Sequence, residues 1–186
     1  MTMTNNTMTN HSAMNLTQLS SAQLHQLNDM PNVAIMDTTH INKEQPPFVL
    51  VDGSYYLFRT YHALPPMTTS KGLHTNAIKG TLNALNKLMR RHHPTHMAVA
   101  FDSKSPTFRH KLSSDYKANR PSMDSELAEQ IPYIHRLIQA LGIPLIHIEG
   151  AEADDIIGTL THRACQEGHH VIISTGDKDM AQLVND

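Results

Sequence analysis

The chain has 186 residues, a formal net charge of -2 and a hydrophobic fraction of 39%. This length corresponds to one domain or to part of a larger one, and the charge gives the whole chain no bias toward polyanions. A single cysteine, Cys165, excludes an internal disulfide framework and is typical of a reducing compartment. No apolar stretch approaches the roughly 18 residues of a membrane span, and the N-terminus lacks the basic and apolar regions of a secretory signal. We therefore expect a cytoplasmic protein without a membrane-spanning segment.

The N-terminal part of the chain differs in composition from the rest. Residues 1–46 are rich in Thr, Asn, Ser, Met and Gln and poor in large apolar residues, which favours a disordered leader. We expect the folded part to occupy residues 47–186. Its first apolar run, 48–51, is typical of a strand, and a short helix is expected over 55–63.

A longer helix and a second strand follow. Thr75 or Asn76 can cap the helix, and Pro94 should end it before a strand over 97–101. The apolar residues of this helix recur at helical spacing and are Ile78, Leu82, Leu85 and Met89.

After a loop, the next helix should begin near Ser122 or Asp124 and end at Gly142, with Pro132 kinking it or closing its first turn. Its inward-facing residues are expected to be Leu127, Ile131, Ile134, Leu137, Ile138 and Leu141. The remaining elements are a strand over 143–148, a helix over 152–167, a strand over 171–173 and a helix from Asp177 that buries Met180, Leu183 and Val184. Strands that alternate with helices predict an α/β fold with a parallel sheet.

Acidic residues follow each of the four predicted strands. Because the carboxyl ends of parallel strands meet at one edge of a sheet, these side chains should converge there. Two unit charges about 4 Å apart repel by roughly 4 kcal/mol at an effective dielectric near 20, so such a cluster requires cations. Carboxylate oxygens suit hard ions, which predicts a site for Mg²⁺ or Mn²⁺. The candidate ligands are Asp52, Asp102, Glu152, Asp154, Asp155, Asp177 and Asp179.

Each acid also has a purely structural interpretation. An aspartate after a strand is often a turn former or a helix cap, and acids in a first helical turn gain from the helix dipole. One acid is enough for capping, however, and the same chemistry recurs at four strand ends. The fourteen histidines lack the cysteine or carboxylate spacing of a zinc site and are interpreted as structural or exposed.

A basic loop lies between Ser103 and Pro121, directly after the second strand. Its cations alternate with aromatic rings, a combination that suits a nucleic-acid strand through phosphate pairing and base stacking. A solvated loop is the alternative. The residues concerned are Lys104, Phe108, Arg109, Lys111, Tyr116, Lys117 and Arg120, and Arg59 on the first helix is a further candidate phosphate contact.

Five segments of the chain resemble the N-terminal 5'-3' exonuclease domain of bacterial DNA polymerase I, a member of the flap endonuclease group. The resemblance covers about residues 47–186. The segments are Leu50-Val51-Asp52-Gly53-Ser54, Phe101-Asp102-Ser103-Lys104, Tyr116-Lys117-Ala118-Asn119-Arg120-Pro121, Glu152-Ala153-Asp154-Asp155 and Ser174-Thr175-Gly176-Asp177-Lys178-Asp179.

The resemblance implies a PIN-like parallel sheet flanked by helices and a monomeric nuclease that uses two divalent ions in its complete domain. The implied substrates are DNA with a 5' flap or nick and RNA primers paired with DNA. By position, Asp52, Asp102, Glu152 and Asp154 match the first metal site, and Asp155, Asp177 and Asp179 complete it and begin the second. Tyr116, Lys117 and Arg120 match an arch that receives the 5' strand, with Arg109 at its base and with Lys117 and Arg120 at the scissile phosphate.

The family continues beyond the position of Asp186 with further acids of the second metal site and with elements that grip the duplex. The resemblance therefore implies a C-terminally truncated domain. Two other functions stay open: a non-catalytic nucleic-acid-binding fragment, and a phosphatase or receiver-like domain, which would not need the basic loop.

Overall fold

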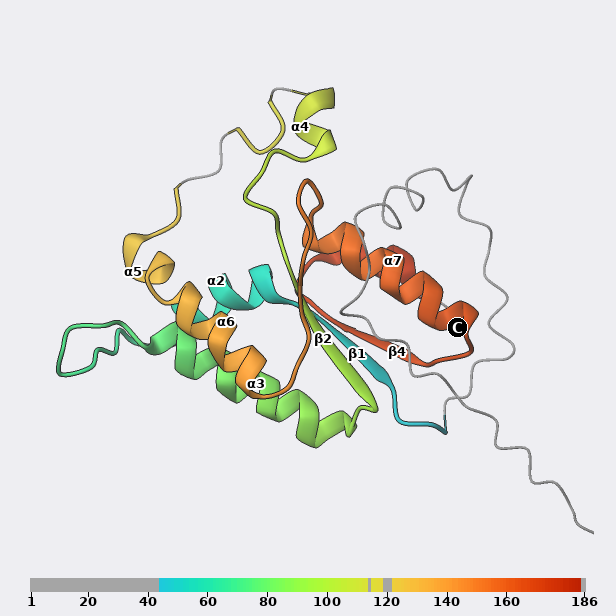
Figure 1. Cartoon of the computed structure of the whole chain (residues 1–186), viewed down its shortest axis with the longest axis horizontal. Helices are drawn as coiled ribbons and strands as arrows, with labels where there is room; N and C mark the ends of the chain where they lie inside the picture. Colours follow the sequence, from blue (N-terminus) through green and yellow to red (C-terminus); the bar gives the residue numbers. More distant parts are fainter. Residues whose placement is uncertain (1–43, 114, 119–121, 185–186) are drawn as a thin grey trace, which may run out of the picture.

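The computed structural model describes residues 44–113, 115–118 and 122–184, so most of the expected leader, 1–43, lies outside the described residues. Four strands form one parallel sheet in the spatial order β3-β2-β1-β4 (Figure 1). This arrangement confirms the predicted α/β fold. The strands are β1 (Phe48–Asp52), β2 (His96–Phe101), β3 (Leu145–His147) and β4 (Val171–Ser174).

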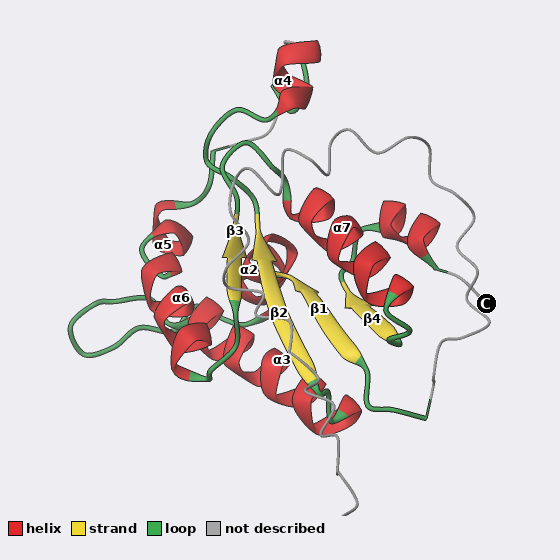
Figure 2. Cartoon of the chain, turned by 45° about the vertical axis from the view of Figure 1, so that its right-hand side comes forward, coloured by secondary structure: helices red, strands yellow, loops and turns green. Residues whose placement is uncertain are grey.

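Helices cover both faces of the sheet (Figure 2). On one face lie α2 (Gly53–Ala63), α3 (Asn76–His92), α5 (Ser125–Ala128) and α6 (Ile131–Ala140). The other face is covered by α7 (Ala153–Gln166) and the 3₁₀ helix η2 (Lys178–Leu183). The short helix α4 (Phe108–Leu112) belongs to neither layer.

The central strand β1 shows how the sequence builds both cores. Successive side chains of a strand point to opposite faces of the sheet. Val49 and Val51 are fully buried in the cluster formed with α2, α3 and α6, and Leu50 is buried in the cluster formed with α7. A strand buried on both faces reads as a continuous apolar run, which is what residues 48–51 show.

The single helix expected from Ser122 or Asp124 to Gly142 is instead two helices, α5 and α6. Pro132 lies in the first turn of α6, where its missing N–H costs no helical hydrogen bond. Leu127, Ile134 and Ile138 are buried as predicted, whereas the prediction for Leu141 was wrong, since that residue is 37% exposed beyond the end of α6.

The last helix differs from the prediction in type and in length. It is a 3₁₀ helix that ends at Leu183, so Val184 lies outside it and is 74% exposed. Met180 is buried against α7, as predicted.

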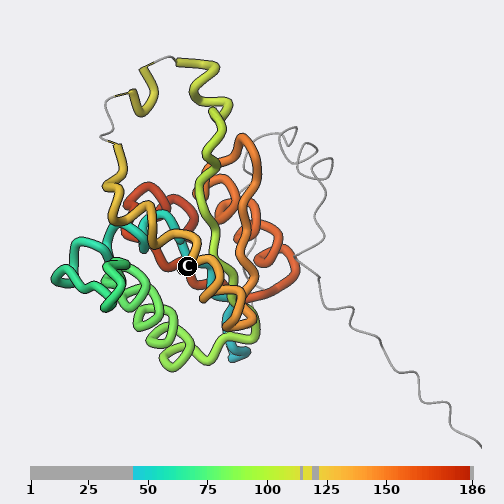
Figure 3. The backbone as a smooth tube through the Cα atoms, turned by 60° about the vertical axis from the view of Figure 1, so that its left-hand side comes forward, coloured from blue at the N-terminus to red at the C-terminus, as the bar shows by residue number. Residues whose placement is uncertain are grey.

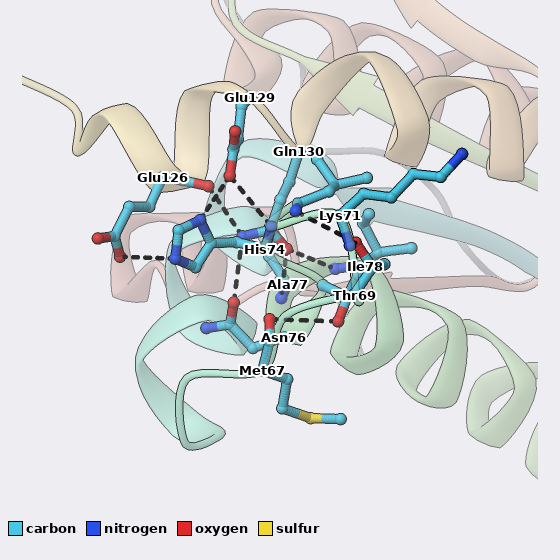
Figure 4. Close-up of polar contacts among 12 residues, drawn as sticks. Met67, Thr69, Lys71, His74, Asn76, Ala77, Ile78, Glu126, Glu129 and Gln130 are labelled. Carbon is cyan, nitrogen blue, oxygen red and sulfur yellow. Dashed lines mark hydrogen bonds and ion pairs between the residues drawn. The ribbon is translucent and has the colours of Figure 1, made fainter.

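The turn between α5 and α6 is fixed by a buried glutamine, Gln130, whose contacts Figure 4 shows. Its Oε1 accepts the backbone N–H groups of Ala77 and Ile78 at 2.9 and 3.2 Å, which caps the N-terminus of α3. Its Nε2 donates to Asn76 Oδ1 at 3.1 Å and to the Glu126 carbonyl at 2.9 Å. Four satisfied polar contacts explain why a full amide can be buried in the turn between the two helices.

The loop before α3 is joined to α5 as well. The His74 ring pairs with Glu129 and lies 3.7 Å from Glu126, and the His74 backbone N–H donates to Glu129 at 3.1 Å (Figure 4). This network connects α5 to the α2–α3 layer.

The segment between β2 and α5 projects beyond the carboxyl ends of the strands (Figure 3). It carries α4 and residues 115–118, and it lies between the end of β2 and the start of α5 in the chain. We call this segment, residues 103–124, the arch. Among the described helices, none has the length and apolar character needed to span a bilayer.

Candidate metal and nucleic-acid site

Asp52 ends β1 and begins α2. Its Oδ1 accepts the Tyr55 N–H at 2.9 Å, so it caps the helix. Its Oδ2 accepts the Thr175 hydroxyl at 2.8 Å from the end of β4. The parallel register pairs Val51 with Ser174, which brings Thr175 beside Asp52. Two donors from different elements thus fix a carboxylate that is only 5% exposed.

Asp102 lies directly after β2 and joins two further elements. Its backbone N–H donates to the Ser54 hydroxyl at 2.9 Å, and its Oδ1 accepts the Ala153 N–H at the start of α7 at 2.8 Å. Asp102 therefore lies between the N-termini of α2 and α7, as the strand-end argument predicts.

Four aspartates from different elements act on one another electrostatically. Burial raises the pKa of Asp154 to about 6, and the charges of Asp52, Asp177 and Asp102 add to this effect. Burial also raises the pKa of Asp52, with the Tyr55 and Thr175 hydrogen bonds opposing and Asp102 and Asp177 reinforcing the shift. The hydrogen bonds that join Asp52 to the Thr175–Asp177 loop and Asp102 to the start of α7 place these carboxylates at the same edge of the sheet, where their like charges reinforce the effect of burial.

Glu152 and Asp155, in contrast, are paired with the arch. Arg109 forms a bidentate ion pair with Asp155, at 2.7 and 2.8 Å, and its Nη1 lies 3.2 Å from Glu152. Lys117 Nζ lies 2.8 Å from Glu152 Oε1, and the Tyr116 hydroxyl donates to Oε2 at 2.9 Å. Glu152 is 4% exposed, and both of its carboxylate oxygens contact side chains of the arch.

The contacts between the arch and α7 lower the pKa of one residue, Asp155, and raise that of another, Tyr116. Burial is the largest single influence and would raise the pKa of Asp155. The hydrogen bonds from Arg109 and the Glu152 N–H, together with the charges of Arg109 and Lys117, outweigh it, so the pKa lies below its ordinary value. For Tyr116, burial and the hydrogen bond to Glu152 both raise the pKa of the phenol. The site therefore contains ionised acids held by arch cations beside aspartates that repel one another.

The chemistry of the donors fits a hard divalent cation, because the facing groups are carboxylates and oxygen-only ligand sets are what Mg²⁺ and Mn²⁺ take. Within the described residues, no three His, Cys, Asp or Glu side chains are arranged so that they could already hold an ion. Two of the acids, Glu152 and Asp155, have their oxygens turned to Arg109 and Lys117 instead.

The remaining predicted residues are distributed as follows. Asp177 caps η2 by accepting the Asp179 N–H at 2.9 Å, and both side chains are exposed. Arg59 lies on α2, where Nη1 donates to the Tyr55 hydroxyl at 3.4 Å. Arg120 lies outside the described residues.

Sequence reasoning missed the hydroxyl residues that orient these acids. The Ser54 hydroxyl accepts the backbone N–H of Asp102, and the Thr175 hydroxyl donates to the carboxylate of Asp52. The Ser174 hydroxyl shares a hydrogen bond of 2.7 Å with the Tyr56 hydroxyl. Their position in the sequence could have indicated this role, because each of them follows or ends a strand and lies two or three residues from an acid.

Comparison with known proteins assigns the fold and the family. Residues 47–186 match the family described as 5'-3' exonuclease, N-terminal resolvase-like domain. A DNA polymerase I of Pseudomonas aeruginosa is 55% identical over 141 residues, which cover 76% of this chain and 15% of that protein. A 5'-3' exonuclease of Aquifex aeolicus is 42% identical over 137 residues, covering 74% of this chain and 47% of that protein. The chain thus spans less than half the length of these relatives.

Solved structures with the same fold share less sequence. A bacteriophage T5 flap endonuclease in a complex with DNA and metal ions has a TM-score of 0.58 and 22% identity, covering 75% of this chain and 52% of that one. A T5 5'-exonuclease with bound zinc ions has a TM-score of 0.55 and 21% identity over the same shares. The chain belongs to the family of 5'-3' exonuclease N-terminal, resolvase-like domains.

Proposed function

We propose that this chain provides the carboxylate site and the arch of a metal-dependent 5' nuclease. The observation that carries the proposal is a set of contacts at the carboxyl edge of the sheet. Thr175 joins Asp52 to the Asp177 segment, Asp102 accepts the Ala153 N–H beside Asp154, and Arg109 and Lys117 of the arch reach the same edge at Glu152. Relatives named DNA polymerase I and 5'-3' exonuclease support it, as do structural neighbours solved with DNA and metal ions. The reaction is hydrolysis of phosphodiester bonds near a 5' end.

Asp52, Asp102 and Asp154 would hold a first divalent cation, and Asp177 and Asp179 would contribute to a second. Bound there, such ions lower the pKa of a water molecule and stabilise the leaving oxygen. Mg²⁺ is the proposed physiological ion, and Mn²⁺ should replace it, since both take oxygen ligands.

The arch residues act on the nucleic acid itself. Lys117 and Arg120 would offset the charge that develops on the scissile phosphate, while Tyr116 offers a ring on which a base can stack. Arg109 and Arg59 would contact phosphates that flank the reacting one. For Glu152 and Asp155 to join the ligand set, the arch cations that pair with them must first move to the phosphate.

The proposed substrates are DNA carrying a 5' flap or nick and RNA primers paired with DNA, bound by a monomer.

A second candidate function is nucleic-acid binding without cleavage. Two observations on the described residues favour it. Arg109 and Lys117 form ion pairs with Glu152 and Asp155, and no three acids are arranged so that they could hold an ion. The arch would then bind a strand while the acids only balance its charge.

Incubating the purified chain with an end-labelled 5'-flap duplex and Mn²⁺ tests both functions. The nuclease proposal predicts short labelled products with the wild type, loss of cleavage in Asp52→Ala and Asp154→Ala, and unchanged cleavage in Glu167→Ala. Glu167 is a matched control, because it is an exposed acid at the opposite end of α7. Cleavage retained by either aspartate variant rejects the nuclease site, and binding without products supports the second candidate.

A further inference from the structure

Thr175 makes two hydrogen bonds that link separate parts of the site. Its hydroxyl donates to Asp52 Oδ2 at 2.8 Å, across 123 positions of sequence, and accepts the Asp177 backbone N–H at 3.0 Å. A hydroxyl has one hydrogen and two lone pairs, and an ionised carboxylate only accepts, so these two roles are the ones this geometry allows.

The contact with Asp177 alone would be ordinary. A threonine hydroxyl that accepts an N–H two residues later is a common loop device. The contact with Asp52 sets this threonine apart, because it crosses from the end of β4 to the end of β1. Together the two bonds join Asp52 and Asp177, which are otherwise on separate elements.

The bond to Thr175 also completes the orientation of the Asp52 carboxylate. Oδ1 accepts the Tyr55 N–H at 2.9 Å and Oδ2 accepts the Thr175 hydroxyl, so rotation of the group would break at least one bond. Each oxygen keeps a second lone pair, and these remain available to a cation.

The loop that carries Thr175 is held in place without its hydroxyl. A Cβ at Gly176 would overlap with the Tyr55 ring, which shows how closely this ring packs on the loop. The Tyr56 hydroxyl hydrogen-bonds Ser174 at 2.7 Å on the other side of Thr175. Removing the Thr175 hydroxyl should therefore change the orientation of Asp52 more than the path of the loop.

We propose that Thr175 is a positioning residue for the metal site: its hydroxyl orients the Asp52 carboxylate toward the first proposed cation and links it to the Asp177 segment. This inference rests on the proposed function of the site. Groups that orient metal ligands typically contribute about 10- to 100-fold to metal affinity when they are removed singly.

The test compares Thr175→Val, which keeps the shape and loses the hydroxyl, with Thr175→Ser, which keeps the hydroxyl. Mn²⁺ binding to the purified chain is measured by isothermal titration calorimetry without substrate, and unfolding is followed by circular dichroism. We expect Thr175→Val to weaken Mn²⁺ binding roughly 10-fold or more. The Thr175→Ser variant should stay within about 2-fold of the wild type, since it restores both hydrogen bonds.

Asp154→Asn serves as the reference that separates the two proposals. If the wild type binds Mn²⁺ and Asp154→Asn does not, the metal site stands, and equal affinities of Thr175→Val and the wild type would overturn the role of Thr175. If the wild type binds no Mn²⁺, the proposed metal site fails and the role of Thr175 falls with it. Should Thr175→Val fail to fold, Thr175→Ala against Thr175→Ser gives the same comparison, and equal affinities there also overturn the role.

Discussion

The Arg109 guanidinium holds the Asp155 carboxylate with two hydrogen bonds, from Nη2 to Oδ1 at 2.7 Å and from Nη1 to Oδ2 at 2.8 Å. This pair joins α4 of the arch to the first turn of α7, and the same arginine lies 3.2 Å from Glu152. Bidentate geometry is the strongest form of an arginine–carboxylate contact. The base of the arch is therefore attached to the helix that carries Asp154 and Asp155 and whose N-cap is Glu152.

Replacing Arg109 should loosen this attachment and destabilise the protein. Arg109→Ala leaves Asp155 without its partner, and because the arginine is partly exposed we expect a loss of only about 1 kcal/mol in the free energy of unfolding. Urea denaturation measures the loss. Lys111→Ala is the control, because Lys111 lies exposed on the same short helix. Equal stabilities of the two variants would contradict the assigned contact.

The pKa of Asp154 leads to a prediction about pH. In the folded protein the pKa is raised from 3.8 to about 6, so the folded state binds more protons than the unfolded state between these values. The contribution of Asp154 to stability therefore falls as pH rises through this window and is lowest above it. Asp154→Asn should stabilise the metal-free protein by about 1 to 2 kcal/mol at pH 8 and have little effect near pH 4.

Thermal unfolding at several pH values in a chelating buffer checks this expectation, with Glu167→Gln on the same helix as the control. A gain for Asp154→Asn that is equally large at pH 4 and pH 8 would show that the cost of ionising Asp154 is not its cause.

Two glycine substitutions should have opposite effects. A Cβ at Gly176 would overlap with the Tyr55 ring, so Gly176→Ala should cost about 1 to 3 kcal/mol of stability through overpacking. At Gly158, inside α7, the nearest atom to a new Cβ is Leu183 Cδ1 at 3.9 Å, an ordinary contact. There alanine should stabilise the protein by roughly 0.5 to 1 kcal/mol through helix propensity. Chemical denaturation measures the free energy of unfolding of both variants. A destabilised Gly158→Ala together with an unchanged Gly176→Ala would contradict the packing described at these two glycines.

Gln130 should be among the most sensitive positions outside the site. It is 0% exposed and accepts the N–H groups of Ala77 and Ile78, so Gln130→Ala leaves buried donors without partners and creates a cavity. We expect a loss of about 2 to 4 kcal/mol. Gln139→Ala, at an exposed position of α6, is the control and should change stability by less than about 0.5 kcal/mol. A loss at Gln130 as small as that at Gln139 would mean that α3 is capped in another way.

The sheet and the acids at its edge could be predicted because they depend on local patterns. The apolar runs that end at Asp52 and Asp102 predict two strands, and because the strands are parallel they also predict that both acids lie at the same edge of the sheet, at the carboxyl ends of the strands. Pro132 indicated an interruption in the helix that became α5 and α6, but the contacts of Gln130 with α3 could not be predicted, since they join residues more than fifty positions apart in the sequence.

The sequence also does not show which side chains pair with each other within the site. The sequence predicted Arg109 as a nucleic-acid contact and Asp155 as a metal ligand, yet nothing local indicates that they pair with each other. The same holds for Thr175 and Asp52, which only the register of β1 and β4 brings together.

The most direct test asks whether one ion lies among the aspartates at the sheet edge. Substoichiometric Mn²⁺ added to the ¹⁵N-labelled chain broadens the NMR signals of amides close to the bound ion. We expect the amides of Gly53 and Ala153, beside Asp52 and Asp154, to broaden before any others. Uniform broadening, or broadening that is strongest at His92 and His93, would contradict a metal site built from these acids.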